Sequence, residues 1–459
     1  MKKILLFVFL LFTFSKNYSQ TIAGGVNHSL SICIDGTIMA WGNNLDGQLG
    51  IANNNILGSN VPLQVVSLTS VISVAAGGTG APNTGHSLAL KSDGTVWAWG
   101  YNYDGELGNG NNVKSIIPIQ VSSLTGMIAI AAGGNNSLAL KSDGTVWAWG
   151  DNDFGQLGDG TNLDNNIPVQ VSSLSGIISI SCGFQHSLAL KSDGTVWAWG
   201  RNTGGQLGNG NNSESNLPVQ VNSLTGVIAI AAGGHSLALK SDGNVWSWGS
   251  NINGELGNGN NFWSNVPIQV SSLTGVIAIA AGGQHSLALK NDGTVWGWGD
   301  NNLGQIGNGN YTDRTTPAQI SFLTGAVSIA GGGMHSLVLK SDGTMRALGY
   351  NNYGQLGNGN NSWSNVPVQV TGLCQVSTTI NETIKNSDII VSPNPTNSVF
   401  SISGVDINTF KYVEIVDLSG AILLRKNSFT DIDISSLSSG FYLFRVVGKA
   451  IYNGKIIKQ

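Results

Sequence analysis

One phrase recurs seven times along this chain, and the repetition limits what the chain can fold into. In its sixth copy the phrase runs from His285 to Gly307 and reads HSLALKNDGTVWGWGDNNLGQIG. A period of about 50 residues is typical of stacked arrays and propellers. The glycine that closes the Trp-x-Trp-Gly motif, or its equivalent, falls at Gly42, Gly100, Gly150, Gly200, Gly249, Gly299 and Gly349.

Each copy has the pattern of four short strands. Val276–Ala281, His285–Leu289 and Thr294–Trp298 are three of them, and a proline-led run such as Pro267–Val270 is the fourth. Asp292-Gly293 joins the second and third strands, and this dipeptide is preferred in two-residue hairpins that need positive φ. Four strands in each of seven copies predict an all-β, seven-bladed β-propeller. One blade cannot bury both its faces alone, so each must pack on its neighbours.

The repeated phrases also carry a family resemblance. His-Ser-Leu-Ala-Leu, Asp-Gly-Thr-Val-Trp-Ala-Trp-Gly and Asn-x-x-Gly-Gln-Leu-Gly resemble the repeat of the regulator of chromosome condensation family, over residues 21–373. The resemblance implies a seven-bladed propeller. It implies little about function, because the family includes nucleotide-exchange factors, enzyme inhibitors and many bacterial proteins.

Composition narrows the class of partner. Hydrophobic residues make up 41% of the chain and charged residues 10%, and there are 64 glycines, which suits a turn-rich β protein. The repeats hold ten Lys and Arg residues against eighteen Asp and Glu residues, with no basic cluster. We therefore expect neither nucleic acid nor an anionic membrane surface as a partner.

The N-terminal segment has the pattern of a secretory signal peptide. In residues 1–20, Lys2 and Lys3 precede the apolar run Ile4–Phe14, which is too short to span a membrane. The propeller is then expected over residues 21–373 of an exported protein.

The first and last repeats depart from the others, as terminal repeats commonly do. The first repeat has only Thr21–Gly24 for its innermost strand, and the last has Arg346 and Leu348 in place of the two tryptophans. Either this stub suffices to close the ring, or Gln375–Ile380 returns to supply the missing strand. The sequence leaves both closures open.

The chain changes character after Leu373. Residues 374–388 have the composition of a linker, and residues 389–459 alternate like strands. The motifs of this segment, from Val391-Ser-Pro-Asn-Pro to the ending Gly454-Lys-Ile-Ile-Lys-Gln459, resemble the C-terminal sorting domain of the type IX secretion system. The resemblance implies a small β-sandwich, recognition by the type IX machinery and export across a Gram-negative outer membrane; an ordinary β-sandwich module is the alternative. The expected strands are Val399–Ser403, Tyr412–Asp417, Ile422–Leu424 and Phe441–Val447.

Six histidines share one repeat position, where the third repeat has Asn136. Packed sheets lie about 10 Å apart, whereas zinc binds nitrogen at about 2 Å. Equivalent histidines therefore cannot share an ion, and we expect each imidazole to hold backbone groups near the top of its blade. The six are His28, His86, His186, His235, His285 and His335.

The carboxylates do not suggest catalysis. Seven aspartates precede turn glycines, where their turn role explains them, and Glu106 and Glu255 occupy the Gln position of the Gly-Gln-Leu-Gly motif. No repeat breaks register to bring two carboxylates together, so a paired-carboxylate hydrolase is not expected. Asp151–Gly155 resembles a calcium loop but lacks its remaining ligands. Nucleophile, phosphate-loop and Cys/His metal motifs are also missing, so we expect no enzyme, cofactor or metal site.

The Trp-x-Trp pairs place both rings on the same side of a strand, which could form an aromatic ladder for sugars. Ten of the thirteen tryptophans recur at identical positions in the second to sixth repeats. This regularity favours packing between blades over sugar binding.

The three cysteines have different expected roles. Cys182 replaces Ala132 and Ala232 and is expected to be a buried free thiol. Cys33 ends the second strand of the first repeat, and Cys374 follows the last strand of the seventh, so both lie on one rim where the ring closes. We expect a Cys33–Cys374 disulfide, which an exported location allows, provided that the Cα atoms lie within about 7 Å.

Side chains that vary between repeats gather on one rim, opposite the Asp-Gly hairpins. The third-to-fourth strand loops and the first-to-second turns emerge there, and the second repeat adds a longer turn, Thr79–Gly85. Exposed aromatic and Arg residues commonly anchor binding surfaces; for Trp263 and Trp363 the alternative is that they cover a blade edge. The candidate binding residues are Tyr101, Tyr103, Phe154, Arg201, Trp263, Tyr311, Arg314, Tyr353 and Trp363.

These observations favour a non-enzymatic propeller, secreted or on the outer surface of a Gram-negative bacterium, that binds a protein or glycan through this rim. The first alternative is a secreted enzyme inhibitor, like the β-lactamase-inhibiting propellers that the repeat resembles. A less favoured alternative is a polysaccharide-acting enzyme whose site is scattered over several loops. Nucleotide exchange is not expected, because an exported protein does not meet a small nuclear GTPase.

Overall fold

The computed structural model describes residues 22–79, 84–374, 390–392, 398–403, 411–416, 422–428, 430–437, 440–447 and 451–458. Two compact units divide the chain between Cys374 and Gln375, and each is described by itself. Every regular element in the described residues is a β-strand, as the repeat pattern predicts. The described part of the chain contains no helix long and apolar enough to cross a membrane.

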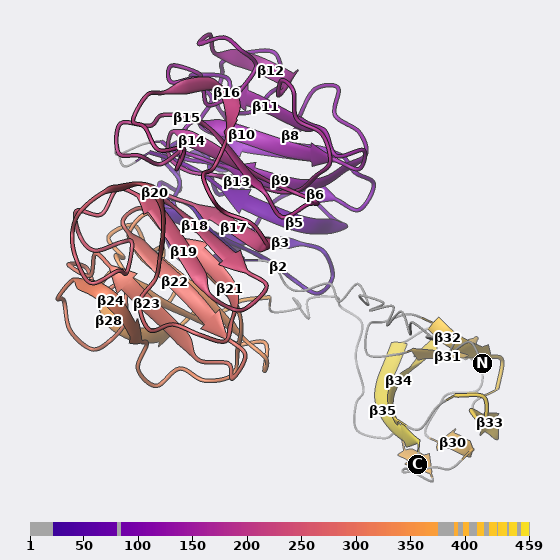
Figure 1. The fold of residues 1–459 in the computed structure, drawn as a ribbon. Helices are drawn as coiled ribbons and strands as arrows, with labels where there is room; N and C mark the ends of the chain where they lie inside the picture. The colour runs from indigo at the N-terminus through magenta and orange to yellow at the C-terminus, as the bar shows by residue number, and fades with distance from the viewer. Residues whose placement is uncertain are drawn as a thin grey trace, which may run out of the picture. The chain divides into compact units, whose positions relative to one another are not determined.

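The unit that ends at Cys374 is a seven-bladed propeller (Figure 1). Each blade is a four-stranded antiparallel sheet made by one continuous stretch of chain. The strands, blade by blade, are β1 (Ile22–Gly24), β2 (His28–Ile32), β3 (Ile38–Asn43) and β4 (Gly58–Gln64); β5 (Val71–Ala76), β6 (His86–Lys91), β7 (Val96–Gly100) and β8 (Ser115–Gln120); β9 (Met127–Ala132), β10 (Asn136–Lys141), β11 (Val146–Gly150) and β12 (Asn165–Gln170); β13 (Ile177–Cys182), β14 (His186–Lys191), β15 (Val196–Gly200) and β16 (Ser215–Gln220); β17 (Val227–Ala232), β18 (His235–Lys240), β19 (Val245–Gly249) and β20 (Ser264–Gln269); β21 (Val276–Ala281), β22 (His285–Lys290), β23 (Val295–Gly299) and β24 (Arg314–Gln319); β25 (Ala326–Gly331), β26 (His335–Lys340), β27 (Met345–Gly349) and β28 (Ser364–Gln369).

The ring closes without a returning strand. Strand β1 pairs with β2 in the register Ala23↔Leu30 and contacts the innermost strands of its two neighbours, β5 and β25. The N-terminal stub therefore completes the first blade, and the first of the two closures is the observed one. The other candidate, Gln375–Ile380, lies outside the described residues.

The hairpins between the second and third strands have three-residue loops, so the predicted two-residue loop is wrong. Lys91 N–H donates to Thr95 O at 3.0 Å, and Gly94 N–H donates to Lys91 O at 2.9 Å. Only the glycine has positive φ, 78° at Gly94, which is the geometry of a type I turn followed by a bulge. The predicted turn role of the aspartate is confirmed, because Asp93 Oδ1 accepts the Thr95 N–H at 3.0 Å and its hydroxyl at 2.6 Å.

A closed ring of side-chain hydrogen bonds joins all seven blades. Each histidine Nε2 lies 2.6–3.0 Å from the hydroxyl of the serine at the second position of the second strand of the next blade. Asn136 takes the place of histidine in the third blade, at 3.4 Å. The predicted partner, the backbone, is therefore wrong, because the imidazole reaches a side chain of the next blade. The pairs are His28–Ser87, His86–Ser137, Asn136–Ser187, His186–Ser236, His235–Ser286, His285–Ser336 and His335–Ser29.

The serine in each pair fixes the histidine tautomer. Ser286 Oγ donates its one hydrogen to Glu255 O at 2.9 Å, so it must accept from the Nε2–H of His235. A glycine lies against the imidazoles of His28, His86, His186, His285 and His335; a Cβ on Gly282, for example, would lie 2.2 Å from His285 Cε1. These five glycines are therefore required by close approach. Burial lowers the pKa of all six histidines, so the imidazoles are neutral.

The second tryptophan of each pair belongs to the same network. Trp298 is fully buried, and its Nε1–H donates to Glu255 O at 2.8 Å, the carbonyl that Ser286 also uses. The expected packing between blades is confirmed for these tryptophans. The first tryptophan of the pair is only half-buried, and Trp296 lies under the Lys290 ammonium, 5.4 Å from the ring centroid.

The structure joins Cys33 to Cys374 by a disulfide across the closure, with Cα atoms 5.4 Å apart. Cys182 is free and buried. The bridge links the first blade to the residue that follows the last, in addition to the noncovalent contacts of β1.

The second unit contains two small sheets. Strands β29 (Ile390–Ser392), β30 (Val399–Ser403) and β33 (Ile432–Asp433) form one, and β32 (Ile422–Lys426), β31 (Tyr412–Val416), β34 (Gly440–Val447) and β35 (Ile451–Lys458) form the other. Strands predicted over 399–403, 412–417, 422–424 and 441–447 are present with small shifts at their ends. Buried side chains from both sheets, including Phe400, Val413 and Phe444, share one core, as in a β-sandwich.

We expect the Cys33–Cys374 disulfide to stabilise the propeller. Cys33→Ser plus Cys374→Ser should lower the free energy of unfolding by about 2–4 kcal/mol, because a long loop is no longer constrained in the unfolded chain. Urea unfolding followed by tryptophan fluorescence measures this directly, since all thirteen tryptophans lie between Trp41 and Trp363. Cys182→Ala, which copies Ala132, is the matched control and should change stability by about 1 kcal/mol or less. Equal midpoints for the double variant and the wild type would contradict the expectation.

We also expect the buried histidines that join the blades to make the stability of the propeller sensitive to acid. Burial lowers the pKa of His285 to about 4, while histidine in an unfolded chain titrates near 6.5. The unfolded state therefore binds protons that the folded state does not, so the stability present above pH 6.5 is lost as pH falls. Between pH 7 and pH 5, His285→Asn, which copies Asn136, should lose about 2 kcal/mol less stability than the wild type.

The measurement is urea unfolding at both pH values. Asn291→Ser, which copies the turn of other repeats, is a control that leaves titration unchanged. The histidine account fails if His285→Asn and the control lose the same stability between the two pH values.

Candidate binding surface

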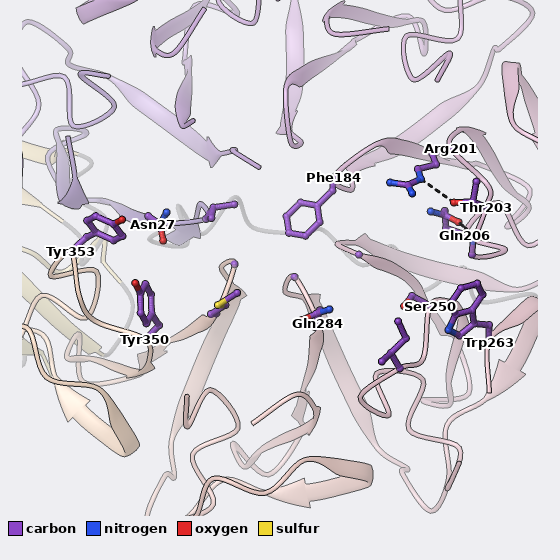
Figure 2. A pocket seen from close by; sticks show the side chains of 17 residues that line it. Asn27, Phe184, Arg201, Thr203, Gln206, Ser250, Trp263, Gln284, Tyr350 and Tyr353 are labelled. Atoms are coloured by element: carbon purple, nitrogen blue, oxygen red, sulfur yellow. Dashed lines mark hydrogen bonds between the residues drawn. The ribbon is translucent and has the colours of Figure 1, made fainter. Parts of the chain in front are cut away.

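A depression of about 560 Å³ lies on the loop rim of the propeller (Figure 2). Two kinds of segment line it: the first-to-second strand turns, which supply Val26, Phe184 and Met334, and the third-to-fourth strand loops, which supply Arg201 and Trp263. Both kinds were predicted to emerge on one rim, and their side chains meet there. Blades one, four, five, six and seven all contribute to the depression, which is called the rim pocket below.

Three of the nine candidate residues, Arg201, Trp263 and Tyr353, line the rim pocket. The Arg201 side chain bonds to Gln185, donates to Thr203 Oγ1 at 2.9 Å, and lies over the Phe154 ring at 5.3 Å. The guanidinium is thus held in place from three sides. Trp263 is 54% exposed, so its ring remains available to a ligand.

The other candidates lie outside the rim pocket. Tyr101 and Tyr103 stack on each other with centroids 5.5 Å apart. Trp363 packs at 5.8 Å on Tyr350 and donates its Nε1–H to Asn352 Oδ1 at 2.6 Å, so it acts as a support for a pocket residue. Phe154 similarly supports Arg201, whereas Tyr311 and Arg314 are exposed away from the pocket lining.

Sequence reasoning missed Phe184, which lies at the centre of the rim pocket in Figure 2. It occupies a position that is glycine in five of the other repeats, and only Val26 departs in the same way. Its ring crosses the propeller axis, because a Cβ on Gly283 would lie 3.1 Å from Phe184 Cζ. The departure from glycine was the available signal. Phe184 forms the apolar floor of the pocket and covers the glycine-lined channel on the axis.

Tyr350 was also missed, although it follows the closing glycine as Arg201 does in its own blade. It meets Tyr353 edge to face with centroids 6.2 Å apart. The rim pocket thus has an aromatic wall of Tyr350 and Tyr353 and, facing it in Figure 2, a wall that carries Trp263 and Arg201. None of the described residues that line this pocket is Asp or Glu.

A separate acidic cluster lies between blades two and three. Carboxylate oxygens of Asp151, Asp153 and Asp164 lie within 4.8 Å of one another. The expectation that carboxylates do not come together is therefore wrong. The loop after β11 folds back, so that Asp164 Oδ1 accepts the Asn152 N–H at 2.8 Å and lies beside Asp151.

Two more carboxyl groups border these three from the preceding blade. Glu106 is fully buried; its Oε2 accepts the Asp104 N–H at 3.0 Å, and its Oε1 has no hydrogen-bond partner among the described residues. Burial, with the charges of Asp104 and Asp151, raises the pKa of Glu106 to about 8. Burial and the neighbouring aspartates likewise raise the pKa of Asp151 to about 6.

Comparisons with known proteins agree with this architecture. Residues 10–288 match the RCC1-like domain, residues 292–339 and 342–379 match the regulator of chromosome condensation (RCC1) repeat, and residues 391–459 match the secretion system C-terminal sorting domain. The sorting domain indicates a secreted or cell-surface bacterial protein.

Similar proteins include Protein pim1 of Schizosaccharomyces pombe, 32% identical over 25% of this chain and 25% of its own length. The Ultraviolet-B receptor UVR8 of Arabidopsis thaliana is 33% identical over 25% of each chain. The chain thus spans only a quarter of the length of these relatives.

Solved structures share the fold. Human WBSCR16 has a TM-score of 0.65 at 24% identity, covering 73% of this chain and 94% of its own. Prp20p of Saccharomyces cerevisiae has the same TM-score and identity and covers 79% of this chain and 88% of its own.

We expect Glu106→Gln to stabilise the chain at alkaline pH. Because burial raises the pKa of Glu106 above its unfolded value of 4.5, the folded state loses stability as pH rises from 4.5 towards 8. Glutamine, which occurs at the equivalent position of the third repeat as Gln156, carries no charge and removes this loss. The gain in free energy of unfolding should be larger at pH 8 than at pH 5 by about 3.5 kcal/mol. It is measured by urea unfolding in chelator-containing buffer, so that no divalent cation contributes. Glu214→Gln, at an exposed position, is the control, and a gain that does not change with pH would contradict the expectation.

Proposed function

Because the chain belongs to the RCC1-like domain family and ends in a secretion sorting domain, we propose that it is an exported, non-enzymatic recognition protein that binds a protein or glycan through its loop rim. The observation that carries this is the rim pocket, whose volume of about 560 Å³ falls in the range of ligand sites. Export through the type IX machinery of a Gram-negative bacterium is part of the same proposal. It rests on the sorting domain and on the signal-peptide pattern of residues 1–20, which lie outside the described residues.

The chemistry of the rim pocket suits a ligand with apolar faces and hydroxyl or amide edges. Trp263, Tyr350 and Tyr353 offer aromatic surface, and such residues contribute much of the affinity of recognition sites. Arg201 and Gln206 offer polar contacts beside them. No pair of carboxylates occurs among the described residues that line the pocket, which favours binding over hydrolysis.

The scaffold supports recognition rather than movement. Buried hydrogen bonds join every pair of neighbouring blades, so the loops of five blades are held in fixed relation around the pocket. Loops on such a scaffold vary without disturbing the core. A rigid site of this kind loses little entropy on binding.

Inhibition of an extracellular enzyme is the second candidate function. Phe184, Trp263 and Ile252 give the rim pocket apolar surface, with Trp263 54% and Ile252 57% exposed, and such surface can contact a partner protein. A propeller that inhibits an enzyme would contact the enzyme through this surface, and no small ligand would need to fill the pocket. The experiment below includes a protein arm for this reason.

We expect Trp263→Ala plus Tyr353→Ala to weaken ligand binding about tenfold or more, because two exposed anchors are lost from one pocket. Binding of the full chain to a glycan array and to extracellular proteins of neighbouring cells measures the loss. Glycan binding that the double variant lacks supports the glycan ligand, and capture of an enzyme whose activity falls supports inhibition.

Tyr311→Ala is the matched control, because Tyr311 is an exposed rim aromatic, 49% exposed, outside the pocket. Tryptophan fluorescence and circular dichroism check that each variant is folded. Equal binding by the double variant, the control and the wild type would overturn the proposed site.

A further inference from the structure

We propose that the acidic cluster between blades two and three binds a divalent cation, with Ca²⁺ as the best match, through Asp151, Asp153 and Asp164. Their three carboxylate oxygens lie within 4.8 Å of one another. Two oxygens that share one Ca²⁺ at 2.3–2.6 Å each are at most about 5 Å apart. The spacing therefore suits a common ion, although no metal was expected from the sequence.

Between blades one and two, the positions equivalent to part of this cluster hold an aspartate whose charge is balanced by a lysine of the next blade. Asp46 lies four residues after the closing glycine of blade one, and Lys114 lies fourteen residues after that of blade two. Lys114 Nζ lies 3.3 Å from Asp46 Oδ1 and 3.1 Å from Leu45 O. The ammonium thus bridges the two blades at this point.

Between blades two and three the lysine is replaced by a carboxylate. The equivalents of Asp46 and Lys114 are Asp104 and Asp164, so an acid faces an acid. After burial, the charge of Asp164 is the main cause that raises the pKa of Asp104. No Lys or Arg of the described chain pairs with Asp104, Asp151, Asp153 or Asp164. A cation from solution would take the place of the lysine.

Glu106 gives a second, independent indication. It is 0% exposed, and its Oε1 has no partner among the described residues. Its other oxygen, Oε2, accepts the Asp104 N–H at 3.0 Å, so this carboxylate lies beside Asp104, on which the charge of Asp164 acts. A buried carboxylate oxygen without a donor is costly unless a proton or a cation satisfies it.

The same combination recurs three blades further on. Glu255 occupies the position of Glu106, is 1% exposed, and also leaves Oε1 without a partner in the described structure. It faces Asp300 and Asp313, the equivalents of Asp151 and Asp164. Glutamate at this position occurs only where the next blade supplies both aspartates; the other five repeats have Gln there. The three acids therefore form one unit, and the set between blades two and three is the richer in carboxylates.

The test uses the full chain, titrated with CaCl₂ and MgCl₂ after chelation, with calorimetry for binding and tryptophan fluorescence for thermal unfolding. We expect Ca²⁺ to bind in the range of about 10⁻⁴–10⁻³ M, typical of extracellular modules, and to raise the unfolding midpoint. Asp164→Asn should weaken binding about tenfold or more. Asp193→Asn, in an exposed hairpin turn, is the matched control and should bind like the wild type.

Asp164→Lys is the decisive variant, because it copies Lys114. It should unfold in chelator at or above the midpoint of the calcium-loaded wild type, and it should not respond to Ca²⁺ at this site. Absence of binding heat and of a thermal shift in the wild type would overturn the proposal and assign the cluster to proton sharing. A calcium response that persists unchanged in Asp164→Lys would overturn the assignment to these residues.

Discussion

The structure depends on the hydrogen bond that each blade makes to the next one. The histidine Nε2–H donates to a serine hydroxyl of the next blade, and that hydroxyl donates to a main-chain carbonyl of the blade that carries the histidine. All of these groups are buried. Buried polar groups without partners are costly, so a blade is satisfied only when both neighbours are present. The series ends where it began, with His335 bonded to Ser29. Because the same contact occurs seven times and the ring must close, the angle between neighbouring blades has little freedom.

The architecture could be predicted because the sequence of a single repeat determines the strands of one blade. Strand order, the hairpin aspartates and the buried second tryptophan all follow from residues that lie close together within one copy. The Cys33–Cys374 pairing required only the knowledge that the first and last repeats meet. The partner of each imidazole could not be predicted in this way, because its serine lies in another blade and nothing in the local pattern points to it. The hairpin loop was misjudged because Asp-Gly fits two turn types, and only φ at the aspartate separates them.

The binding surface was less predictable for the same reason. Its pocket combines Val26 of the first blade with Phe184 of the fourth and Tyr350 of the seventh, and reasoning within one repeat does not place these together. Exposure was a good guide to the rim but a poor one to the pocket, since Trp363 and Phe154 support pocket residues from outside. The acidic cluster was missed although its three aspartates belong to one repeat, because only the fold-back of the loop after β11 brings Asp164 beside Asp151. The further carboxylates beside this cluster, Asp104 and Glu106, come from the preceding blade.

The disulfide determines how the propeller responds to tension. The residues that match the sorting domain, 391–459, come after Cys374 in the chain, so a pull on that domain enters the propeller at this residue. There the covalent bridge divides the pull between the last blade and the end of strand β2 in the first. Peeling blade seven away strand by strand would then require breaking a bond between sulfur atoms. A cell-surface protein held by its C-terminal end under shear would keep its ring closed until that bond failed.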